Sequence, residues 1–349
     1  MAHGDPFIEI IIPNWNGAKM LSHCLDSLEK QLYKNFSITV VDNGSSDHSL
    51  TLLEEDYPNV KVIRFDYNSG FSVAVNKGIE SSEAPWLLLL NNDMEVPSDC
   101  LQNLATSIPL YSHCDFFSLK MLSYHDRTII DGAGDAVLRG GVGYRLGTLE
   151  PDGERFSNDR DTFGACAGAA LYKRTFFQKV GLFDADFFAY LEDVDLNIRA
   201  RRLGLQCMYL SKAVVYHIGS ATTGSKINEM TIRLSTRNNV NLLVKNYSFP
   251  LFLRFAPAIL VYQLMWFLFC LKKWMVKPYF SGLYEAFRML PLFSRKRKDI
   301  LTQFCKSDFQ ILGNLMVTAE REAVESIMMR RRGLGKNNFF LSCYCKIFL

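Results

Sequence analysis

The sequence lacks several patterns that would by themselves identify the structural class of the protein. Its nine cysteines form no CxxC pair, and their spacing fits neither a zinc site nor a disulfide framework, which favours a reduced, cytosolic compartment. The first residues show no basic segment followed by an apolar core, so we expect no secretory signal. No repeat of fixed period appears, which argues against a solenoid or a propeller.

Acidic residues are scarce in the last part of the chain. Residues 251–349 hold 16 Lys and Arg but only six Asp and Glu, whereas residues 1–250 hold 23 basic and 30 acidic residues. The net charge of +3 hides this separation, which suggests two surfaces with different partners. A chain of 349 residues with 48% hydrophobic side chains is long enough for one or two domains and is not disordered.

Short apolar runs alternate with segments of helical spacing in the first hundred residues. This alternation predicts an α/β fold with a mostly parallel, doubly wound sheet flanked by helices. The continuous apolar runs fit strands that are covered on both faces. Strands are expected at 7–13, 37–42, 60–66 and 86–93, and helices at 20–31, 49–57, 72–82 and 193–204. Residues 95–160 are less regular, with a glycine-rich loop or irregular hairpin at 131–147.

A long apolar segment marks the C-terminal region. Residues 255–271 are mostly apolar and are flanked by Arg254, Lys272 and Lys273. Seventeen residues are at the short limit for a membrane span, and a helix at the membrane interface fits equally well. A buried core helix is the alternative. Basic clusters at 294–298 and 330–332 favour anionic lipid over nucleic acid as the partner. We therefore divide the chain into a domain at 1–248 and a helical, membrane-associating region at 249–349.

Polar clusters follow each of the four expected strands, at 13–17, 42–47, 66–70 and 91–93. Because ligands bind beyond the carboxyl ends of parallel strands, these clusters predict one shared site. The absence of GxGxxG after the first strand argues against a dinucleotide. Asp42 could bond a ribose or a base, and Asp93 offers a hard oxygen ligand for Mg²⁺ or Mn²⁺ on a diphosphate. A turn or cap acid is the alternative for Asp93.

A second group of acids stands at the start of the helix expected at 193–204. Glu192, Asp193 and Asp195 could simply complement the helix dipole, or one of them could act as a general base. His217 follows another expected strand. A lone histidine is more often structural, but a histidine and an aspartate on one metal ion are plausible chemistry.

An ordered set of motifs resembles the family 2 glycosyltransferases, which have the GT-A fold, over about residues 7–245. The motifs are "VDNGSSD", "NSGFSVAVNKG", "LLLLNNDM", "FGACAGAALYKRTFF", "GLFDADFFAYLEDVDLNIRARRLG" and "VVYHIGSAT". A further block, "TIRLSTRNNVNLLVKN", is similar to the rhamnosyltransferase-like branch.

The resemblance implies a role for each matching residue. Asp93 and His217 would bind a divalent cation, Mg²⁺ or Mn²⁺, and Asp193 would be the general base, with Glu192 orienting it or the acceptor. Asn91 stands where a DxD motif would have its first aspartate; it and Arg237 would support the metal and the diphosphate. The donor nucleotide would lie against Pro13, Asn14, Asn16, Asp42, Asn43, Gly70, Asn76 and Asn92.

These roles imply an inverting, metal-dependent hexosyl- or deoxyhexosyltransferase. Its donor would be a UDP-, dTDP- or GDP-sugar, and its acceptor a glycan or lipid-linked hydroxyl at the cytoplasmic face of the cell membrane, in cell-surface polysaccharide synthesis, with no role for nucleic acid. Two rivals share the nucleotide-binding layout: a sugar-phosphate nucleotidyltransferase, and a non-catalytic, membrane-docked binder of nucleotides or glycans.

Overall fold

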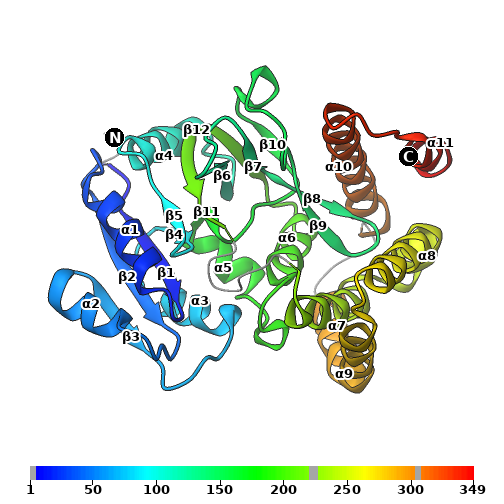
Figure 1. The fold of residues 1–349 in the computed structure, drawn as a ribbon, viewed down its shortest axis with the longest axis horizontal. Helices are drawn as coiled ribbons and strands as arrows, with labels where there is room; N and C mark the ends of the chain where they lie inside the picture. Colours follow the sequence, from blue (N-terminus) through cyan, green and yellow to red (C-terminus); the bar gives the residue numbers. More distant parts are fainter. Residues whose placement is uncertain (1–4, 220–226, 303–307) are drawn as a thin grey trace. The chain divides into compact units, whose positions relative to one another are not determined.

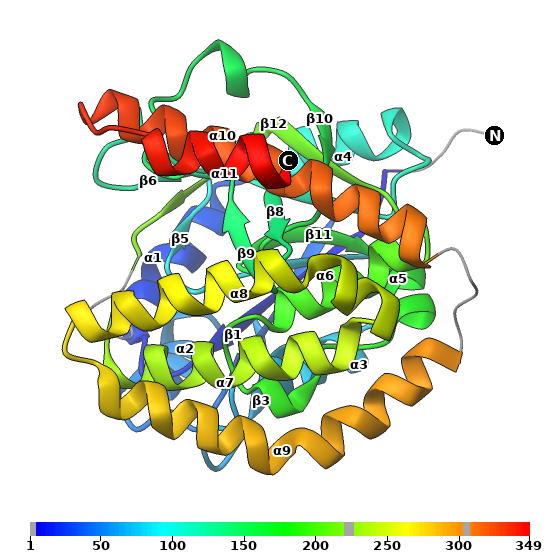
Figure 2. The ribbon, with the colours of Figure 1, turned by 90° about the vertical axis from the view of Figure 1, so that its right-hand side faces the viewer.

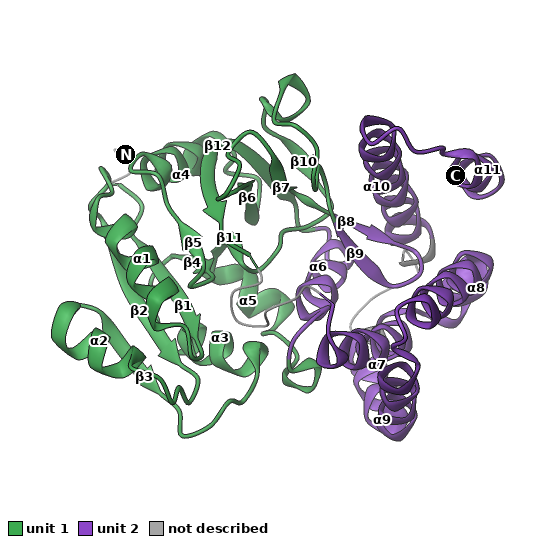
Figure 3. Ribbon diagram, in the orientation of Figure 1, with its two compact units in different colours: residues 1–135, 145–188, 205–224 green, residues 136–144, 189–204, 225–349 purple. Residues whose placement is uncertain are grey.

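The computed structural model describes residues 5–219, 227–302 and 308–349 (Figure 1). The chain forms two compact units (Figure 3). Unit 1 comprises residues 1–135, 145–188 and 205–224, and unit 2 comprises residues 136–144, 189–204 and 225–349. Three segments of the expected first domain, 136–144, 189–204 and 225–248, are thus grouped with the C-terminal helices. The division at residue 248 stays a prediction.

Unit 1 is built on a ten-stranded sheet with the order β10-β12-β6-β11-β4-β1-β2-β3, while β5 pairs with β12 and β7 with β6. A separate pair, β8 and β9, forms a two-stranded sheet. The strands are β1 (Ile8–Asn14), β2 (Phe36–Asp42), β3 (Lys61–Arg64), β4 (Trp86–Leu90), β5 (Met94–Glu95), β6 (Phe116–Ser123), β7 (Ile130–Ala133), β8 (Asp135–Leu138), β9 (Val142–Arg145), β10 (Arg160–Thr162), β11 (Ala169–Lys173) and β12 (Cys207–His217).

Strands β1 to β4 form the parallel part of the sheet. β1 pairs in parallel with β2 and β4, and β2 pairs in parallel with β3. The register sets Asn14 level with Asp42, and Asp42 level with Arg64. The ends of these strands therefore lie at one edge, as the sequence predicts, and this edge carries the polar clusters.

The second half of the sheet departs from a simple parallel order. β11 runs antiparallel between β4 and β6, whereas β12 pairs in parallel with β6. The region at 95–160, expected to be irregular, supplies β6, whose first seven residues are buried in the sheet. The glycine-rich segment forms β7, β8 and β9, so the expectation of an irregular hairpin there is confirmed.

Helices cover both faces of the sheet of unit 1. Leu21, Leu25 and Leu28 of α1 pack with alternate residues of β1 and β4 in one core cluster, which also contains side chains of α2 and α4. On the other face, Gly78 of α3 lies against Ile11 and Val41. The helices are α1 (Ala18–Glu29), α2 (Ser49–Asp56), α3 (Phe71–Glu80), α4 (Cys100–Leu110) and α5 (Arg174–Val180).

Unit 2 is mostly helical. It contains α6 (Glu192–Arg202), α7 (Glu229–Asn246), α8 (Phe249–Lys272), α9 (Val276–Thr302), α10 (Gly313–Gly333) and α11 (Phe339–Phe348). α7 and α8 form an antiparallel hairpin, because Gln263 bonds Asn239 and, three residues further along α8, Trp266 bonds Thr236 (Figure 2). α8 contains the apolar segment expected at 255–271, begins earlier, and is the one described helix long and apolar enough to cross a membrane.

Candidate active site

Hydrogen bonds between side chains join the ends of the parallel strands. Asn14 Nδ2 donates to Asp42 Oδ2 at 3.2 Å, and Asn92 Nδ2 donates to Asn14 Oδ1 at 2.7 Å. Asp42 is fully buried, and its Oδ1 atom accepts the backbone N–H of Ser45 at 3.0 Å. Pro13 lies one residue before Asn14, level with Val41. The structure thus brings together the predicted residues Asn14, Asp42 and Asn92 in one network.

Two further asparagines fix the loops around this network. Asn16 has a φ of 50°, and its Oδ1 atom accepts the backbone N–H of Ser46 at 2.7 Å. Asn43 Nδ2 donates to Asn68 Oδ1 at 3.1 Å, and its Oδ1 atom accepts from the backbone N–H of Ser69 at 2.9 Å. Both amides therefore hold loop backbone in this structure. Contact between either side chain and a nucleotide stays a prediction.

Gly70 and Asn76 anchor the segment that precedes the acidic helix. Gly70 has a φ of 90°, and a Cβ atom there would lie 2.5 Å from Cδ2 of Phe188. Asn76 Nδ2 donates to the carbonyl of Phe183 at 2.8 Å, and its Oδ1 atom accepts the Phe183 N–H at 3.0 Å. The predicted nucleotide role of these residues is untested, but both position residues 183–188.

The centre of the candidate site is a chain of three side chains. His217, the last residue of β12, places Nε2 3.2 Å from Asp93 Oδ2 and Nδ1 2.8 Å from Asp131 Oδ2. Arg145 Nη1 lies 2.5 Å from the same oxygen of Asp131. The other oxygen of Asp93, Oδ1, is buried and has no hydrogen-bond partner among the described residues. Strand pairing explains this convergence, because His217 lies beside Met94 of β5, next to Asp93 in the sequence.

The electrostatics of this trio favour a cation. Burial alone would lower the pKa of His217, but hydrogen bonds and charge from Asp131 and Asp93 outweigh it and raise the pKa to about 9. In the protein alone, the imidazolium therefore places one positive charge between the two carboxylates. A carboxylate oxygen without a partner beside an imidazole nitrogen fits a divalent ion such as Mn²⁺ or Mg²⁺. The remaining ring nitrogen, bonded to a carboxylate, matches the usual support of a metal-binding histidine.

Asn91 and Arg237, the other two residues expected near the metal, each make contacts within their own unit. The backbone N–H of Asn91 donates to the carbonyl of Gly168 at 2.9 Å, and a Cβ atom on Gly168 would lie 2.9 Å from Asn91 Nδ2. Arg237 of α7 donates from Nε to Asn238 Oδ1 at 2.8 Å and lies 3.7 Å from Glu285. The supporting roles of Asn91 and Arg237 at a metal stay predictions. Residues 220–222 of the "VVYHIGSAT" motif, which contains His217, lie outside the described residues.

A strained turn leads into the acidic helix of unit 2. Tyr190 and Leu191 have φ values of 69° and 67°, which non-glycine residues rarely adopt. Asn238 Nδ2 donates to the carbonyls of Ala189 and Tyr190 at 2.8 and 2.7 Å. Strain of this kind persists only where surrounding contacts hold it, and it often occurs at functional sites. Asn238 thus supplies the contacts that maintain the turn.

The three acids of α6 have different surroundings. Asp195 is fully buried, and Lys245, Arg199 and Asn246 bond it at 2.8, 2.9 and 2.8 Å. Burial opposes ionisation of Asp195, but the charges of Lys245 and Arg199 prevail and hold its pKa well below the ordinary range. Asp195 is therefore a structural anion that joins α6 to α7.

Glu192 and Asp193 differ from Asp195 in their surroundings. Burial, reinforced by the Asp193 charge, raises the pKa of Glu192 to about 8. The Oε2 atom of Glu192 is buried and has no hydrogen-bond partner among the described residues. Asp193 is only partly buried, and its Oδ1 atom accepts the Val194 N–H at 2.8 Å. Glu192 is thus a neutral acid at neutral pH, and Asp193 is the more accessible carboxylate.

The sequence interpretation missed three residues of functional interest. Asp131 lies in the glycine-rich segment and bonds His217, while Asn238 and Lys245 lie in the "RNNVNLLVKN" segment and support the acidic helix. Asparagines and a lysine interspersed with leucines and valines in one helical segment were the available signal for the latter two, because polar residues inside a helix bundle need specific partners.

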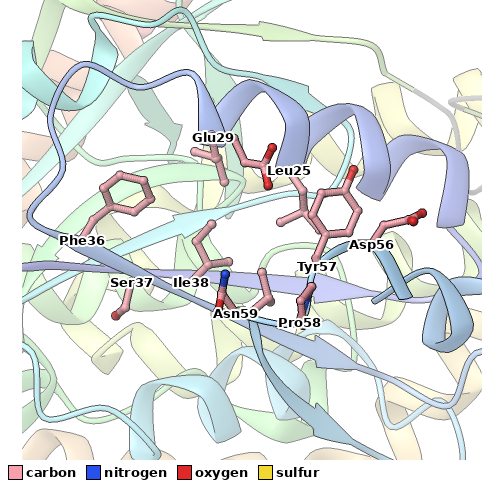
Figure 4. A pocket seen from close by; sticks show the side chains of 11 residues that line it. Leu25, Glu29, Phe36, Ser37, Ile38, Asp56, Tyr57, Pro58 and Asn59 are labelled. Atoms are coloured by element: carbon pink, nitrogen blue, oxygen red, sulfur yellow. The ribbon is translucent and has the colours of Figure 1, made fainter. Parts of the chain in front are cut away.

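A hollow at the opposite edge of the sheet does not belong to this site. Its volume is about 270 Å³, and it lies where α1 ends and β2 begins (Figure 4). Leu25, Phe36, Ile38 and Tyr57 provide much of its lining. The hollow is mainly apolar and lies beside the amino end of β2, whereas the polar network lies at the carboxyl ends.

Known protein sequences agree with the motifs. The Glycosyl transferase family 2 description matches residues 9–181. A PGL/p-HBAD biosynthesis glycosyltransferase of Mycobacterium tuberculosis is 29% identical over 250 residues, which cover 68% of this chain and 89% of that protein. An N-acetylglucosaminyl-diphospho-decaprenol L-rhamnosyltransferase of the same species is 25% identical over 239 residues, covering 62% and 78%.

Solved structures agree with the fold. GalNAc-T7, crystallised with UDP, GalNAc and Mn²⁺, matches with a TM-score of 0.56 and 17% identity. The match covers 70% of this chain and 48% of that one, so this chain spans about half the length of GalNAc-T7. S. aureus TarS 1-349 in complex with UDP matches with a TM-score of 0.50 and 16% identity over 93% and 91% of the chains. The fold is of the GT-A type, and the chain belongs to glycosyltransferase family 2.

Proposed function

We propose that this protein is an inverting glycosyltransferase that moves a sugar from a nucleoside-diphosphate sugar to a hydroxyl of a lipid-linked or surface glycan. The observation that carries the proposal is the buried Asp93 oxygen that has no hydrogen-bond partner in the described part of the chain, next to His217 at the carboxyl edge of a GT-A sheet. An acid in this position suits the diphosphate end of a donor through a divalent cation.

Asp93 Oδ1 and His217 Nε2 would hold the cation, Mg²⁺ or Mn²⁺. When bound, that ion supplies positive charge to the phosphate oxygens of the leaving group. Asp131 would keep Nδ1 of His217 protonated, so that Nε2 can present its lone pair. The loops fixed by Asn16 and Asn43 would shape the nucleotide end of the site.

Asp193 would remove the proton of the acceptor hydroxyl. The acceptor oxygen then bonds the anomeric carbon, the bond from that carbon to the diphosphate oxygen breaks, and the nucleoside diphosphate leaves with the electron pair. One displacement inverts the anomeric centre and needs no carboxylate nucleophile, unlike the retaining scheme of glycoside hydrolysis. Glu192, neutral at pH 7 because of its raised pKa, can donate a hydrogen bond to Asp193 or to the acceptor.

The acceptor is proposed to be lipid-linked for two reasons. A relative is named as acting on a diphospho-decaprenol acceptor, and this chain carries one helix apolar enough to enter a bilayer. We place the enzyme at the cytoplasmic face of the membrane, where nucleotide sugars are made. The donor would be a UDP-, dTDP- or GDP-sugar, since neighbouring structures bind UDP with a GT-A fold.

A panel of nucleotide sugars tests the proposal. The purified protein is incubated with each donor and with Mn²⁺, Mg²⁺ or a chelator, and the released product is identified. Metal-dependent release of nucleoside diphosphate from one donor supports the glycosyltransferase. Release of pyrophosphate from a sugar phosphate and a nucleoside triphosphate would indicate the nucleotidyltransferase instead. Tight donor binding with no turnover on any acceptor extract would favour the non-catalytic binder.

A further inference from the structure

Helix α8 has two faces with opposite surroundings. Buried side chains recur along one face of the helix, at Leu251, Phe255, Ala258, Ile259 and Cys270. The opposite face is exposed and apolar along its length, with Phe249, Phe252, Leu253, Leu260, Val261, Leu264, Met265, Leu268 and Leu271. We call these nine side chains the apolar stripe. A continuous exposed surface of this kind marks an interaction site in most soluble proteins.

The buried face holds α8 along the side of its own unit. Gln263 Nε2 donates to Asn239 Oδ1 at 2.6 Å, and Trp266 Nε1 donates to Thr236 Oγ1 at 2.9 Å. Figure 2 shows α7 and α8 side by side along their lengths. A membrane-crossing α8 would have to break these bonds or take α7 with it. α7 contains buried Lys245 and several asparagines, which are costly in hydrocarbon.

The charges around α8 identify the partner. Of the seven Lys and Arg in residues 230–284, Arg233 and Arg237 lie beside Glu285, and buried Lys245 bonds Asp195. Lys272 and Lys273 at the end of α8 are exposed, and Trp274, directly after them, is 92% exposed. A basic segment and a tryptophan at the end of an apolar stripe are typical of helices that lie in the interface of an anionic bilayer.

We propose that α8 lies in the plane of an anionic membrane surface, with the apolar stripe in the outer acyl region and Lys272 and Lys273 at the lipid phosphates. α8 does not span the bilayer, and the fixed contacts with α7 keep its buried face on the protein. The proposal deepens the proposed function by specifying how the enzyme reaches the membrane of its lipid-linked acceptor, but it stands on the α8 contacts alone.

Vesicle binding by the full-length protein is the first test. Co-sedimentation is measured with vesicles of phosphatidylcholine and with vesicles that also contain phosphatidylglycerol. We expect binding to the anionic vesicles, and a loss on the order of tenfold for each leucine of the Leu260→Glu/Leu264→Glu variant, because each loses the burial of one side chain. The matched control is Leu32→Glu/Leu110→Glu in unit 1, whose leucines are equally exposed at 66% and 68%.

Several results would overturn the proposal. They are no binding of the parent protein to anionic vesicles, equal binding by the Leu260→Glu/Leu264→Glu variant, or equal loss in the control. A parent dimer that this variant converts to monomers, with no vesicle binding by either, would assign the apolar stripe to a second copy of the chain. Unchanged thermal unfolding of the variant in solution shows that it is folded, since both leucines are exposed.

Depth measurement separates a helix in the plane from a helix that spans the membrane. Leu260→Trp places an indole near the middle of α8. The quenching of tryptophan fluorescence is compared between this variant and the parent protein, with lipids brominated either near the headgroup or near the end of the acyl chain. An in-plane helix gives stronger quenching by the shallow bromines. Stronger quenching by the deep bromines would show a spanning helix, whose middle lies at the bilayer centre.

The two proposals fail separately. A protein that binds anionic vesicles but turns over no nucleotide sugar leaves the membrane proposal intact and removes the proposed function. A protein that turns over a nucleotide sugar but ignores vesicles removes the membrane proposal alone.

Discussion

Asp131 holds the imidazole of His217, with 2.8 Å between its Oδ2 atom and the Nδ1 atom of the ring. The ring is thereby oriented with Nε2 towards Asp93. We expect Asp131→Asn to weaken Mn²⁺ binding about 10–100-fold, the usual effect of removing the carboxylate behind a metal-binding histidine. Isothermal titration with Mn²⁺ and nucleoside diphosphate measures the change.

The control for Asp131→Asn is Asp161→Asn, which changes an exposed acid of the same unit. Equal metal affinity of the parent and of the Asp131→Asn variant would show that Asp131 has no influence on the metal. The variant His217→Ala should lose more affinity than Asp131→Asn, because it removes a proposed ligand rather than its support.

Asp193→Asn tests the general base. We expect donor binding to be kept and transfer to fall by about 10²–10⁴-fold, since only proton removal is lost. Donor binding is followed by protection from thermal unfolding, and transfer by release of nucleoside diphosphate with acceptor present. Asp186→Asn, in the same sequence block, is the matched control. Loss of donor binding by Asp193→Asn would reject the base assignment.

The raised pKa of Glu192 predicts a specific dependence of stability on pH. In the folded protein this pKa is about 8, above the ordinary value of 4.5, because of burial and of Asp193. The folded state therefore binds the proton more tightly than the unfolded state, and the stabilisation it gives is complete below pH 4.5 and lost as pH rises through 8. Glu192→Gln should not lose stability over this range.

The measurement is the difference in free energy of unfolding between Glu192→Gln and the parent across that window. We expect the difference to shift in favour of the variant as pH rises. Because both proteins share the titrating groups outside this pair, their difference reports the titration of Glu192 together with its neighbour Asp193. A difference that stays constant with pH would mean that Glu192 titrates normally.

Asn238→Ala should release the strained turn at Tyr190. The variant loses two hydrogen bonds to backbone carbonyls and leaves those carbonyls without their donor, at a cost of about 2–4 kcal/mol in stability. Urea unfolding measures this cost, and Asn158→Ala, at an exposed asparagine, is the control. Transfer should fall more than donor binding, since the turn leads into the acids of α6. A cost equal to that of the control would show that the turn is stable by itself.

Gly70→Ala and Gly204→Ala form a matched pair. Both glycines have positive φ, 90° and 76°, but a Cβ atom on Gly70 would meet Phe188 while one on Gly204 would meet no atom within 4 Å. Each alanine carries backbone strain of about 1–3 kcal/mol, and Gly70, with a ψ of 164°, lies in a region that essentially only glycine adopts. Only the one at position 70 also displaces Phe188, so thermal unfolding should show a larger loss for Gly70→Ala. Equal losses would indicate that residues 183–188 adjust freely.

Local patterns were sufficient to predict β1 to β4 and the helices between them. Each is one continuous stretch whose apolar spacing is visible within about ten residues, and parallel pairing then places the ends of the strands together. The position of Asp93 at the sheet edge follows from this, as does the start of α6 beside Glu192. These predictions needed no knowledge of contacts between distant parts of the chain.

The remaining features depend on distant pairing. Asp131 and His217 are 86 residues apart and meet only because β7 and β12 both pair with β6. Asn238 and Tyr190 are 48 residues apart. The sequence of β11 likewise does not indicate that the strand pairs antiparallel, because the apolar pattern of a buried strand is the same for both directions of pairing. The roles of the asparagines at the strand ends could not be predicted for a different reason. An asparagine amide can hydrogen-bond either a nucleotide or the backbone of a neighbouring loop.

The acids of α6 and the apolar stripe of α8 belong to the same unit and are linked through α7, which bonds Asp195 on one side and α8 on the other. With α8 seated on a membrane, the height of Asp193 above the lipid would be set by the protein. Such an enzyme would select acceptors by the distance between the membrane and the reacting hydroxyl. It would favour acceptors whose hydroxyl reaches that height and discriminate by the length of the glycan between lipid and hydroxyl, independently of which sugar ends it.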